Sequence, residues 1–316
     1  MKKIFAIAIL SISMILSSVG CSNSNQIEKS DKLKIYASFY PIEEVVKKVG
    51  RDKVEIKSIV PSGVEPHHYE ISSKERGALE ESDLIFINGL EMEPWGENLE
   101  SELNEKVIAL GEKVNPLKLE AHDEHDEHEN HDSHDEHNHG DYDPHVWLDP
   151  IRMKEMTAIV AAELSKIDEE NSNYYQENAK EYISKLEDLD REYKEELASF
   201  KNKKAIVSHD AFGYLGDRYK IDFLGVSGIS PEEEPSLKKM GEIVELIKKD
   251  NLKVVFFEEL TSSKVAKSIS EETGARTDVL YTIEGISEKD KKDGMGYIEL
   301  MKRNLESLKK AFEEQN

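Results

Sequence analysis

The chain has 316 residues with 66 acidic and 42 basic side chains, a formal charge of −24, and a hydrophobic content of 38%. This length and composition exclude a wholly disordered chain and are sufficient for two domains with packed cores. The negative charge excludes nucleic acid and anionic lipid surfaces as partners held by long-range attraction, and it favours a cation as the ligand.

The first twenty residues have the pattern of an export signal. Two lysines precede the apolar run IFAIAILSISMIL, which is too short for a comfortable membrane span, and the small residues SSVG follow it. Cys21 comes next, and as the single cysteine it can form no intramolecular disulfide. Its position resembles the lipobox of bacterial lipoproteins, although Ser18 stands where Leu is commonest. We therefore expect a signal peptide over 1–20, a lipidated Cys21 and a tether over 21–32; the alternative is a secreted protein with a free thiol.

The next segment alternates β-rich and helical patterns. The β-rich runs cover 33–41, 53–61, 83–89 and 106–110. Strands that alternate with helices favour a parallel sheet covered by helices. We therefore expect residues 33–170 to form an N-terminal α/β lobe.

A histidine-rich stretch interrupts this lobe. The sequence HDEHDEHENHDSHDEHNHG, residues 122–140, has eight carboxylates and no apolar periodicity. Because so polar a segment cannot bury enough surface to offset its ordering entropy, we expect 117–142 to be a mobile loop. As an accessory collector it would bind zinc weakly; the alternatives are a zinc sensor or a dispensable acidic tract. Its histidines are His122, His125, His128, His131, His134, His137 and His139.

Residues 171–200 lack Gly and Pro and have apolar side chains three and four positions apart. This spacing predicts one amphipathic helix, and about 27 residues at 1.5 Å each reach about 40 Å. A helix of that length can join two lobes as a rigid strut; the alternative is a surface helix of one domain.

Four more β-rich runs follow, over 203–210, 221–228, 252–260 and 275–281. They predict a C-terminal α/β lobe over 201–316. The expected fold class is α/β, with two similar lobes of mainly parallel four-stranded sheets joined by one long rigid helix.

Four histidines lie outside the loop. His67, His145 and His209 each follow an expected strand, where open α/β sheets bind ligands, so they can converge in a cleft between the lobes. His68 points elsewhere in an extended backbone and is expected to be exposed. Imidazole and carboxylate suit zinc. The spacing does not choose a fourth ligand among Asp210, Glu258, Glu259, Asp278 and Glu284.

A secreted zinc hydrolase is the rival function of another class, with Glu258 or Glu259 as general base. Catalytic zinc keeps an open position, and no H-E-x-x-H helix is present in the sequence. These glutamates fit better as carboxylates that orient the histidines. A surface adhesin is possible as an added role, but nothing in the sequence requires it.

Several separated motifs resemble the zinc- and manganese-binding lipoproteins of bacterial ABC importers: SFYPIEEVVKKVG, IVPSGVEPHHYE, DLIFINGLEMEPW, DPHVWLDP, IVSHDAFGYL, GISPEEEPS and TIEGIS. The resemblance covers nearly all of the chain after Cys21. It implies two lobes joined by a rigid helix and a metal site of His67, His145, His209 and Glu284.

The resemblance also implies high-affinity Zn²⁺ capture and delivery to an ABC permease, whose ATPase lies on the cytoplasmic side. The protein would be a monomer that is lipid-anchored at the outer face of the cytoplasmic membrane, with no enzymatic activity and no nucleic acid partner. Manganese is the alternative cargo, but manganese members have a carboxylate where His209 stands, and three imidazoles favour zinc.

Overall fold

The computed structural model describes residues 32–315, except 120–140, 202, 233 and 259–263. The expected signal peptide, Cys21, residues 21–31 of the tether and the seven loop histidines lie outside the described residues. Within the described ranges, no helix is both long enough and apolar enough to cross a membrane.

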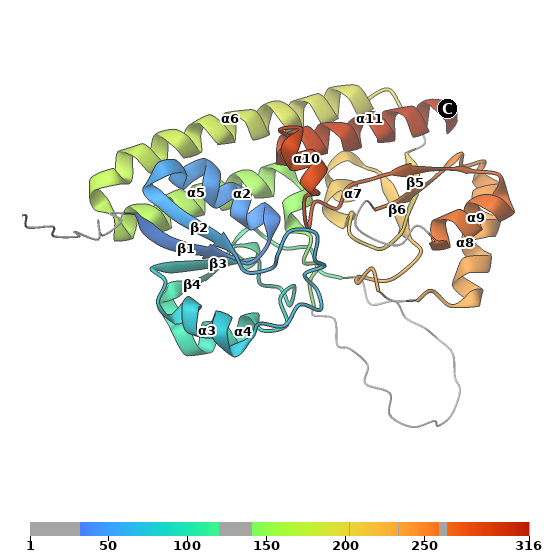
Figure 1. The fold of residues 1–316 in the computed structure, drawn as a ribbon. Coiled ribbons are helices and arrows are strands. Elements are labelled where there is room, and N and C mark those ends of the chain that lie inside the picture. Colours follow the sequence, from blue (N-terminus) through green and yellow to red (C-terminus); the bar gives the residue numbers. More distant parts are fainter. Residues whose placement is uncertain (1–31, 120–140, 202, 233, 259–263, 316) are drawn as a thin grey trace, which may run out of the picture. The chain divides into compact units, whose positions relative to one another are not determined.

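Two four-stranded parallel sheets form the framework (Figure 1). The first has the order β2-β1-β3-β4 and the second the order β6-β5-β7-β8, so both use the same connection pattern. The expected α/β class with two parallel sheets is confirmed. The strands are β1 (Leu33–Ala37), β2 (Val54–Ser58), β3 (Leu84–Ile87), β4 (Val107–Ala109), β5 (Lys204–Val207), β6 (Asp222–Gly225), β7 (Val254–Phe257) and β8 (Arg276–Val279).

Every strand is shorter than its β-rich run, and the first run shows the reason most clearly. Its last residues begin helix α2 (Tyr40–Gly50), because Pro41 stands in the first turn, where its fixed φ suits a helix and its missing N–H costs nothing. The expectation of a strand over all of 33–41 was therefore wrong at its C-terminal end.

Several helices begin where the sequence supplies a side-chain cap. Ser72 forms a capping box with Glu75, the Asp149 carboxylate accepts from the N–H of Ile151, and the Ser236 hydroxyl accepts from the N–H of Lys239. The helices are α3 (Ser73–Glu80), α4 (Gly96–Leu103), α5 (Pro150–Ile167), α6 (Ser172–Leu197), α7 (Gly213–Tyr219), α8 (Leu237–Asp250), α9 (Lys264–Thr273), α10 (Glu288–Lys292) and α11 (Tyr297–Gln315). Short 3₁₀ turns are η1 (Arg51–Lys53), η2 (Asn104–Lys106), η3 (Gly111–Lys113), η4 (Val146–Leu148) and η5 (Glu169–Asn171).

The long helix α6 confirms the helix expected within 171–200. It contacts α2 and α5 beside the first sheet and α7 and α11 beside the second (Figure 1). One hydrophobic cluster includes Ile35 and Phe86 of the first sheet and Val207 and Phe256 of the second. The two sheets therefore share a continuous core, as a strut joining them requires.

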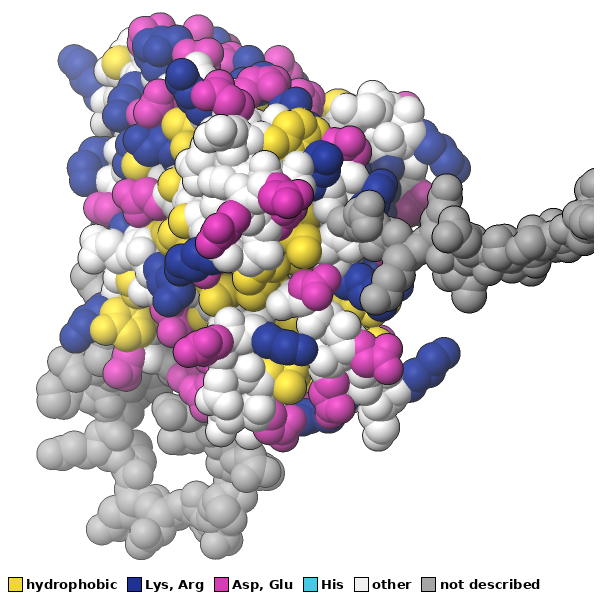
Figure 2. All heavy atoms as spheres, turned by 90° about the vertical axis from the view of Figure 1, so that its left-hand side faces the viewer, with side chains coloured by type: hydrophobic (Ala, Val, Ile, Leu, Met, Phe, Trp, Pro, Cys, Tyr) yellow, Lys and Arg dark blue, Asp and Glu magenta, His cyan; other side chains and the backbone are white. Residues whose placement is uncertain are grey.

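Side chains of both charges occur together on one face of the protein (Figure 2). On the face drawn in Figure 2, Lys and Arg side chains lie among Asp and Glu side chains. Ion pairs such as Arg51 with Glu181 and Lys154 with Glu187 contribute to this pattern. Exposed pairs of this kind stabilise a fold only slightly, so the shared core carries most of the stability.

Candidate metal centre

The structure brings together four of the side chains named as ligands. His67 lies between β2 and α3, His145 precedes η4, His209 lies between β5 and α7, and Glu284 lies between β8 and α10. All of these segments follow the carboxyl ends of strands, where open α/β sheets place their ligands. One donor atom from each residue lies within 4.8 Å of the others.

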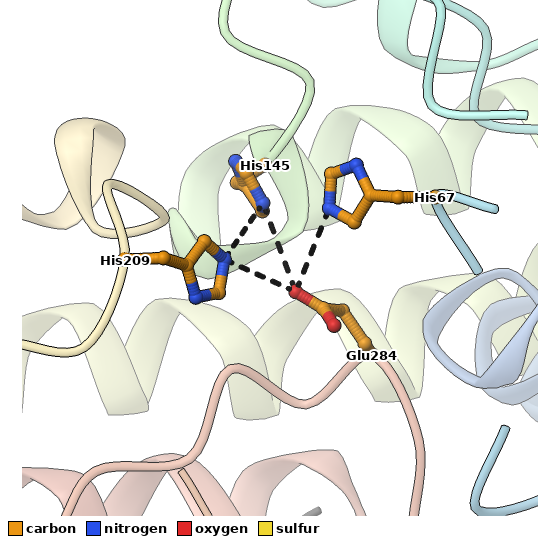
Figure 3. A group of neighbouring side chains, drawn as sticks. All are labelled: His67, His145, His209 and Glu284. Atoms are coloured by element: carbon orange, nitrogen blue, oxygen red, sulfur yellow. Dashed lines mark hydrogen bonds and ion pairs between the residues drawn. The ribbon is translucent and has the colours of Figure 1, made fainter. Parts of the chain in front are cut away.

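The donor atoms face one common point (Figure 3). Oε1 of Glu284 lies 3.6 Å from Nε2 of His209, 3.7 Å from Nε2 of His145 and 4.0 Å from Nε2 of His67. The Nε2 atoms of His145 and His209 are 3.4 Å apart. Zinc at its usual 2.0–2.1 Å from each donor needs separations of about 3.4 Å. Small side-chain shifts would therefore bring all four donors onto one ion.

The centre is dry. His145 and His209 are fully buried, and Glu284 is 6% exposed. Oε1 of Glu284 receives no hydrogen bond within the described part of the chain. A buried carboxylate oxygen without a donor is costly unless something else neutralises it, and a cation among the imidazoles would do so.

The ring of His145 is oriented by Asp143. Oδ1 of Asp143 accepts a hydrogen bond from the His145 backbone N–H at 2.9 Å and lies 2.8 Å from Nδ1 of the ring. This Asx turn leaves Nε2 to face the centre. Gly213 permits the arrangement, because a Cβ there would lie 2.5 Å from Oδ2 of Asp143.

His209 is oriented in the same way by Glu258, which follows the neighbouring strand β7. Oε1 of Glu258 lies 2.6 Å from Nδ1 of His209 and also accepts from the Ser208 hydroxyl. The interpretation of Glu258 as a carboxylate that orients a histidine matches this geometry. Glu259 lies outside the described residues.

Glu284 is positioned by a constrained turn. The preceding Ile283 has a φ of 60°, which is unusual for a β-branched residue, and it is 2% exposed. Nε1 of Trp147 donates to the Thr282 carbonyl at 2.7 Å, and Asn304 bonds both the N–H and the carbonyl of Tyr281 at 2.8 Å. These contacts hold the turn that directs Glu284 to the histidines.

Burial and neighbouring charges shift the pKa values of the two buried imidazoles in opposite directions. Burial lowers the pKa of His145 well below its usual value, and charge on His209 lowers it further. Burial also acts to lower the pKa of His209, but the carboxylates of Glu258 and Glu284 outweigh it and raise that pKa to about 10. Burial raises the pKa of Glu284, while His209 opposes the rise. The metal-free centre therefore holds a proton on His209 between two carboxylates.

Zinc must displace that proton. The affinity for zinc is therefore expected to fall as the pH is lowered, and to do so already at pH values well above the usual imidazole range. Below a pKa of about 10 one proton leaves His209 per zinc bound, which predicts about tenfold weaker binding per pH unit, or about 100-fold from pH 8 to pH 6. Calorimetry at pH 8 in buffers of different ionisation enthalpy measures the released proton. Release near zero at pH 8 would show that His209 titrates as an ordinary imidazole.

Replacing Glu258 by Gln tests the orienting carboxylate. Carboxylates that hold a ligand imidazole typically account for 10- to 100-fold in metal affinity, so Glu258→Gln is expected to weaken zinc binding by about that factor. Proton release at pH 8 should fall too, because Glu258 helps to keep His209 charged. Glu271→Gln, an exposed change on α9, is the control, and competition with a chelator gives the affinities. Equal affinities in both variants would contradict the orienting role.

The remaining sequence candidates lie elsewhere. Asp210 accepts from the Gly225 N–H at 2.8 Å, and Asp278 pairs with Arg276 at 2.6 Å, so neither joins the four donors. Asp143 was missed as a candidate, although the signal was present: an Asp two residues before a histidine with Pro between is a common turn motif.

Comparison with known proteins decides the family. The family model described as "Zinc-uptake complex component A periplasmic" matches residues 35–311. The chain belongs to this family. The ZnuA protein of Bacillus subtilis strain 168, named a high-affinity zinc uptake system protein, is 38% identical over 296 residues, which is 92% of this chain and 92% of that protein. The expected resemblance to importer proteins is confirmed.

Two further likenesses concern AdcA of Streptococcus pneumoniae. The zinc-binding lipoprotein AdcA of strain R6 is 34% identical over 310 residues, covering 96% of this chain but only 61% of AdcA. The crystal structure of its Zn(II)-bound ZnuA-like domain superposes with a TM-score of 0.74 at 33% identity, covering 89% of this chain and 99% of that domain. The likeness to AdcA therefore concerns its ZnuA-like domain.

Proposed function

We propose that this protein captures Zn²⁺ outside the cytoplasm and delivers it to an ABC permease for uptake. The observation that carries the proposal is the buried group of three imidazoles and one carboxylate whose donor atoms lie within 4.8 Å of one another. The names of the relatives support it, since the Bacillus subtilis protein is a zinc uptake protein and the AdcA domain was crystallised with Zn(II).

The donor chemistry supports zinc over manganese. Manganese suits carboxylate, carbonyl and water ligands, whereas imidazole suits zinc. His67, His145 and His209 supply three nitrogens, and Glu284 supplies the single oxygen. A centre of this composition would bind neutral imidazoles and an ionised carboxylate, with Asp143 and Glu258 fixing which ring nitrogen faces the ion.

The geometry weighs against a hydrolase. Oε1 of Glu258, the candidate general base, holds His209 and accepts from Ser208, and Oε2 is buried with no hydrogen bond within the described ranges, so this carboxylate fits an orienting role. The four donors close the coordination shell, whereas catalytic zinc keeps an open position. The family is one of transport components, which agrees with a binding role.

Delivery to a membrane permease requires the protein to stay near the membrane. We propose that a lipid anchor on Cys21 holds it at the outer face of the cytoplasmic membrane. The family description is periplasmic, and the related AdcA is named a lipoprotein. The protein would act as a monomer with the permease and its ATPase. The loop histidines 122–139 would serve as an accessory collector that raises the local zinc concentration.

Replacing Cys21 by Ser is expected to abolish lipid attachment. The variant should lose incorporation of labelled fatty acid and separate from the membrane fraction, because serine lacks the thiol that would carry the lipid. Ser22→Ala at the neighbouring position is the control. Equal labelling of the two variants would contradict the anchor.

Zinc uptake under scarcity tests the proposed function. Cells that lack their own copy of the gene would be supplied with one of three versions. These are the wild type, a triple variant in which Ala replaces His67, His145 and His209, and a deletion of loop residues 122–139. We expect the triple variant to support no zinc-limited growth and to retain no tightly bound zinc when recovered from mixed metals. The loop deletion should keep one zinc per chain. Tight one-to-one zinc binding by the triple variant would overturn the assignment.

A further inference from the structure

A second set of metal-binding side chains lies next to the buried centre. Nδ1 of His68 is 3.3 Å from Oε2 of Glu65 and 3.7 Å from Oε2 of Glu232. One donor atom from each of these three residues lies within 4.8 Å of the others. Glu65 and His68 follow β2 of the first sheet, whereas Glu232 lies between β6 and α8 of the second. The set therefore joins the two halves of the protein.

The set is more exposed than the buried centre. The His68 side chain is 49% exposed and that of Glu232 is 66% exposed, whereas the neighbouring His67 side chain is only 8% exposed. An ion that arrives from solvent can thus reach His68 and Glu232. His68 is the chain neighbour of His67, which belongs to the buried centre.

Glu65 connects the two sets. Its Oε1 lies 4.0 Å from Nε2 of His67, while its Oε2 lies 3.3 Å from Nδ1 of His68. The backbone N–H groups of His67 and His68 donate to Oε1 at 2.7 Å and to Oε2 at 3.2 Å. These two bonds fix the carboxylate with one oxygen toward each histidine. A carboxylate held in this way can pass a cation from one side to the other by ligand exchange.

The donor chemistry suits a temporary site. One imidazole and two carboxylates bind divalent cations, and water would complete the coordination at these exposed positions. Ordering exposed side chains such as Glu232 costs entropy, so affinity should be lower than in the preformed centre. Weak binding is what transfer requires, because the ion must leave.

We propose that Glu65, His68 and Glu232 form an outer zinc site that passes the ion to the buried centre. The proposal rests on the proposed zinc function of that centre. It assigns His68 a role separate from the four buried donors. Loss of the outer site should slow loading of the centre without emptying it at equilibrium.

Crystals of the full chain grown in excess Zn²⁺ would locate the ions by anomalous scattering. We expect one peak among His67, His145, His209 and Glu284 and a weaker peak among Glu65, His68 and Glu232. In the double variant His68→Ala, Glu232→Gln only the weaker peak should vanish. A missing outer peak in the wild type would overturn the outer site. A missing inner peak would instead overturn the proposed function.

Stopped-flow mixing with Zn²⁺ measures the loading. The fluorescence of Trp147 reports the centre, because its ring centroid lies 5.3 Å from that of His145. The double variant should load about tenfold more slowly while the equilibrium zinc affinity of the centre changes less than threefold. Glu234→Gln, an exposed change of equal charge in the same segment as Glu232, is the control and should load at the wild-type rate. Equal rates in the double variant and the control would overturn the transfer role.

Discussion

Substituting His209 by alanine is expected to weaken zinc binding by roughly a hundred- to a thousandfold. Zinc held by four protein ligands has an apparent binding free energy of about 10–16 kcal/mol, so an equal share is about 2.5–4 kcal/mol per ligand. His209 is fully buried, and its Nε2 lies 3.4 Å from that of His145. Water is a poor replacement at so dry a position. Competition with a chelator of known affinity measures the loss.

A second variant separates lost coordination from damaged folding. His209→Ala also leaves the buried Glu258 without its charged partner, which destabilises the metal-free protein. His209→Asp replaces the nitrogen donor with an oxygen donor and should recover part of the affinity, with the preference shifted from zinc toward manganese. An alanine variant that bound one zinc as tightly as the wild type would show that His209 is not a ligand.

The sequence supported the framework because the framework depends on local patterns. Short β-rich runs between helical patterns indicated all eight strands, and the spacing of apolar residues indicated α6. Three histidines after strands were correctly expected to converge, since parallel strands place their carboxyl ends together. Strand ends were less certain, because α2 begins at Tyr40 within an apolar run.

The fourth donor could not be predicted from local residue spacing, because its position depends on contacts between residues that are far apart in the sequence. Five carboxylates lie within or after strands of the second lobe, and only the three-dimensional turn distinguishes Glu284. That turn depends on the positive φ of Ile283, on the Trp147 bond to Thr282 and on Asn304, which are far apart in the sequence. The resemblance to a family pointed to Glu284 where residue spacing alone could not choose, and the structure places its carboxylate among the three imidazoles.

The outer set of Glu65, His68 and Glu232 also could not be predicted from the sequence. The extended backbone expected at His67 and His68 was wrong, because both residues lie in a turn closed by a hydrogen bond from the Tyr69 N–H to the Pro66 carbonyl. His68 is exposed as expected, at 49% of its side chain. Its approach to Glu232 follows from how the two sheets meet, which the sequence does not specify. The proximity of His68 to Glu232 is therefore visible only in the three-dimensional structure.

Loss of the Trp147 side chain should cost several kcal/mol of stability. Trp147 is fully buried, packs edge-on against Phe39 at 5.0 Å between ring centroids, and donates to the Thr282 carbonyl at 2.7 Å. Trp147→Ala removes a large buried ring, and such changes cost about 3–5 kcal/mol. We expect the free energy of unfolding of the metal-free protein, measured by urea denaturation, to fall by that amount.

Two conservative variants isolate the hydrogen bond. Trp147→Phe keeps aromatic bulk but leaves the Thr282 carbonyl without its donor, at a cost of about 1–3 kcal/mol. Trp95→Phe is the matched control, because Trp95 is 3% exposed and its Nε1 has no acceptor among the described residues. Trp147→Phe should also weaken zinc binding, since Thr282 lies two residues before Glu284, whereas Trp95→Phe should not. Equal zinc affinity in the two variants would show that the turn keeps Glu284 in place without Trp147.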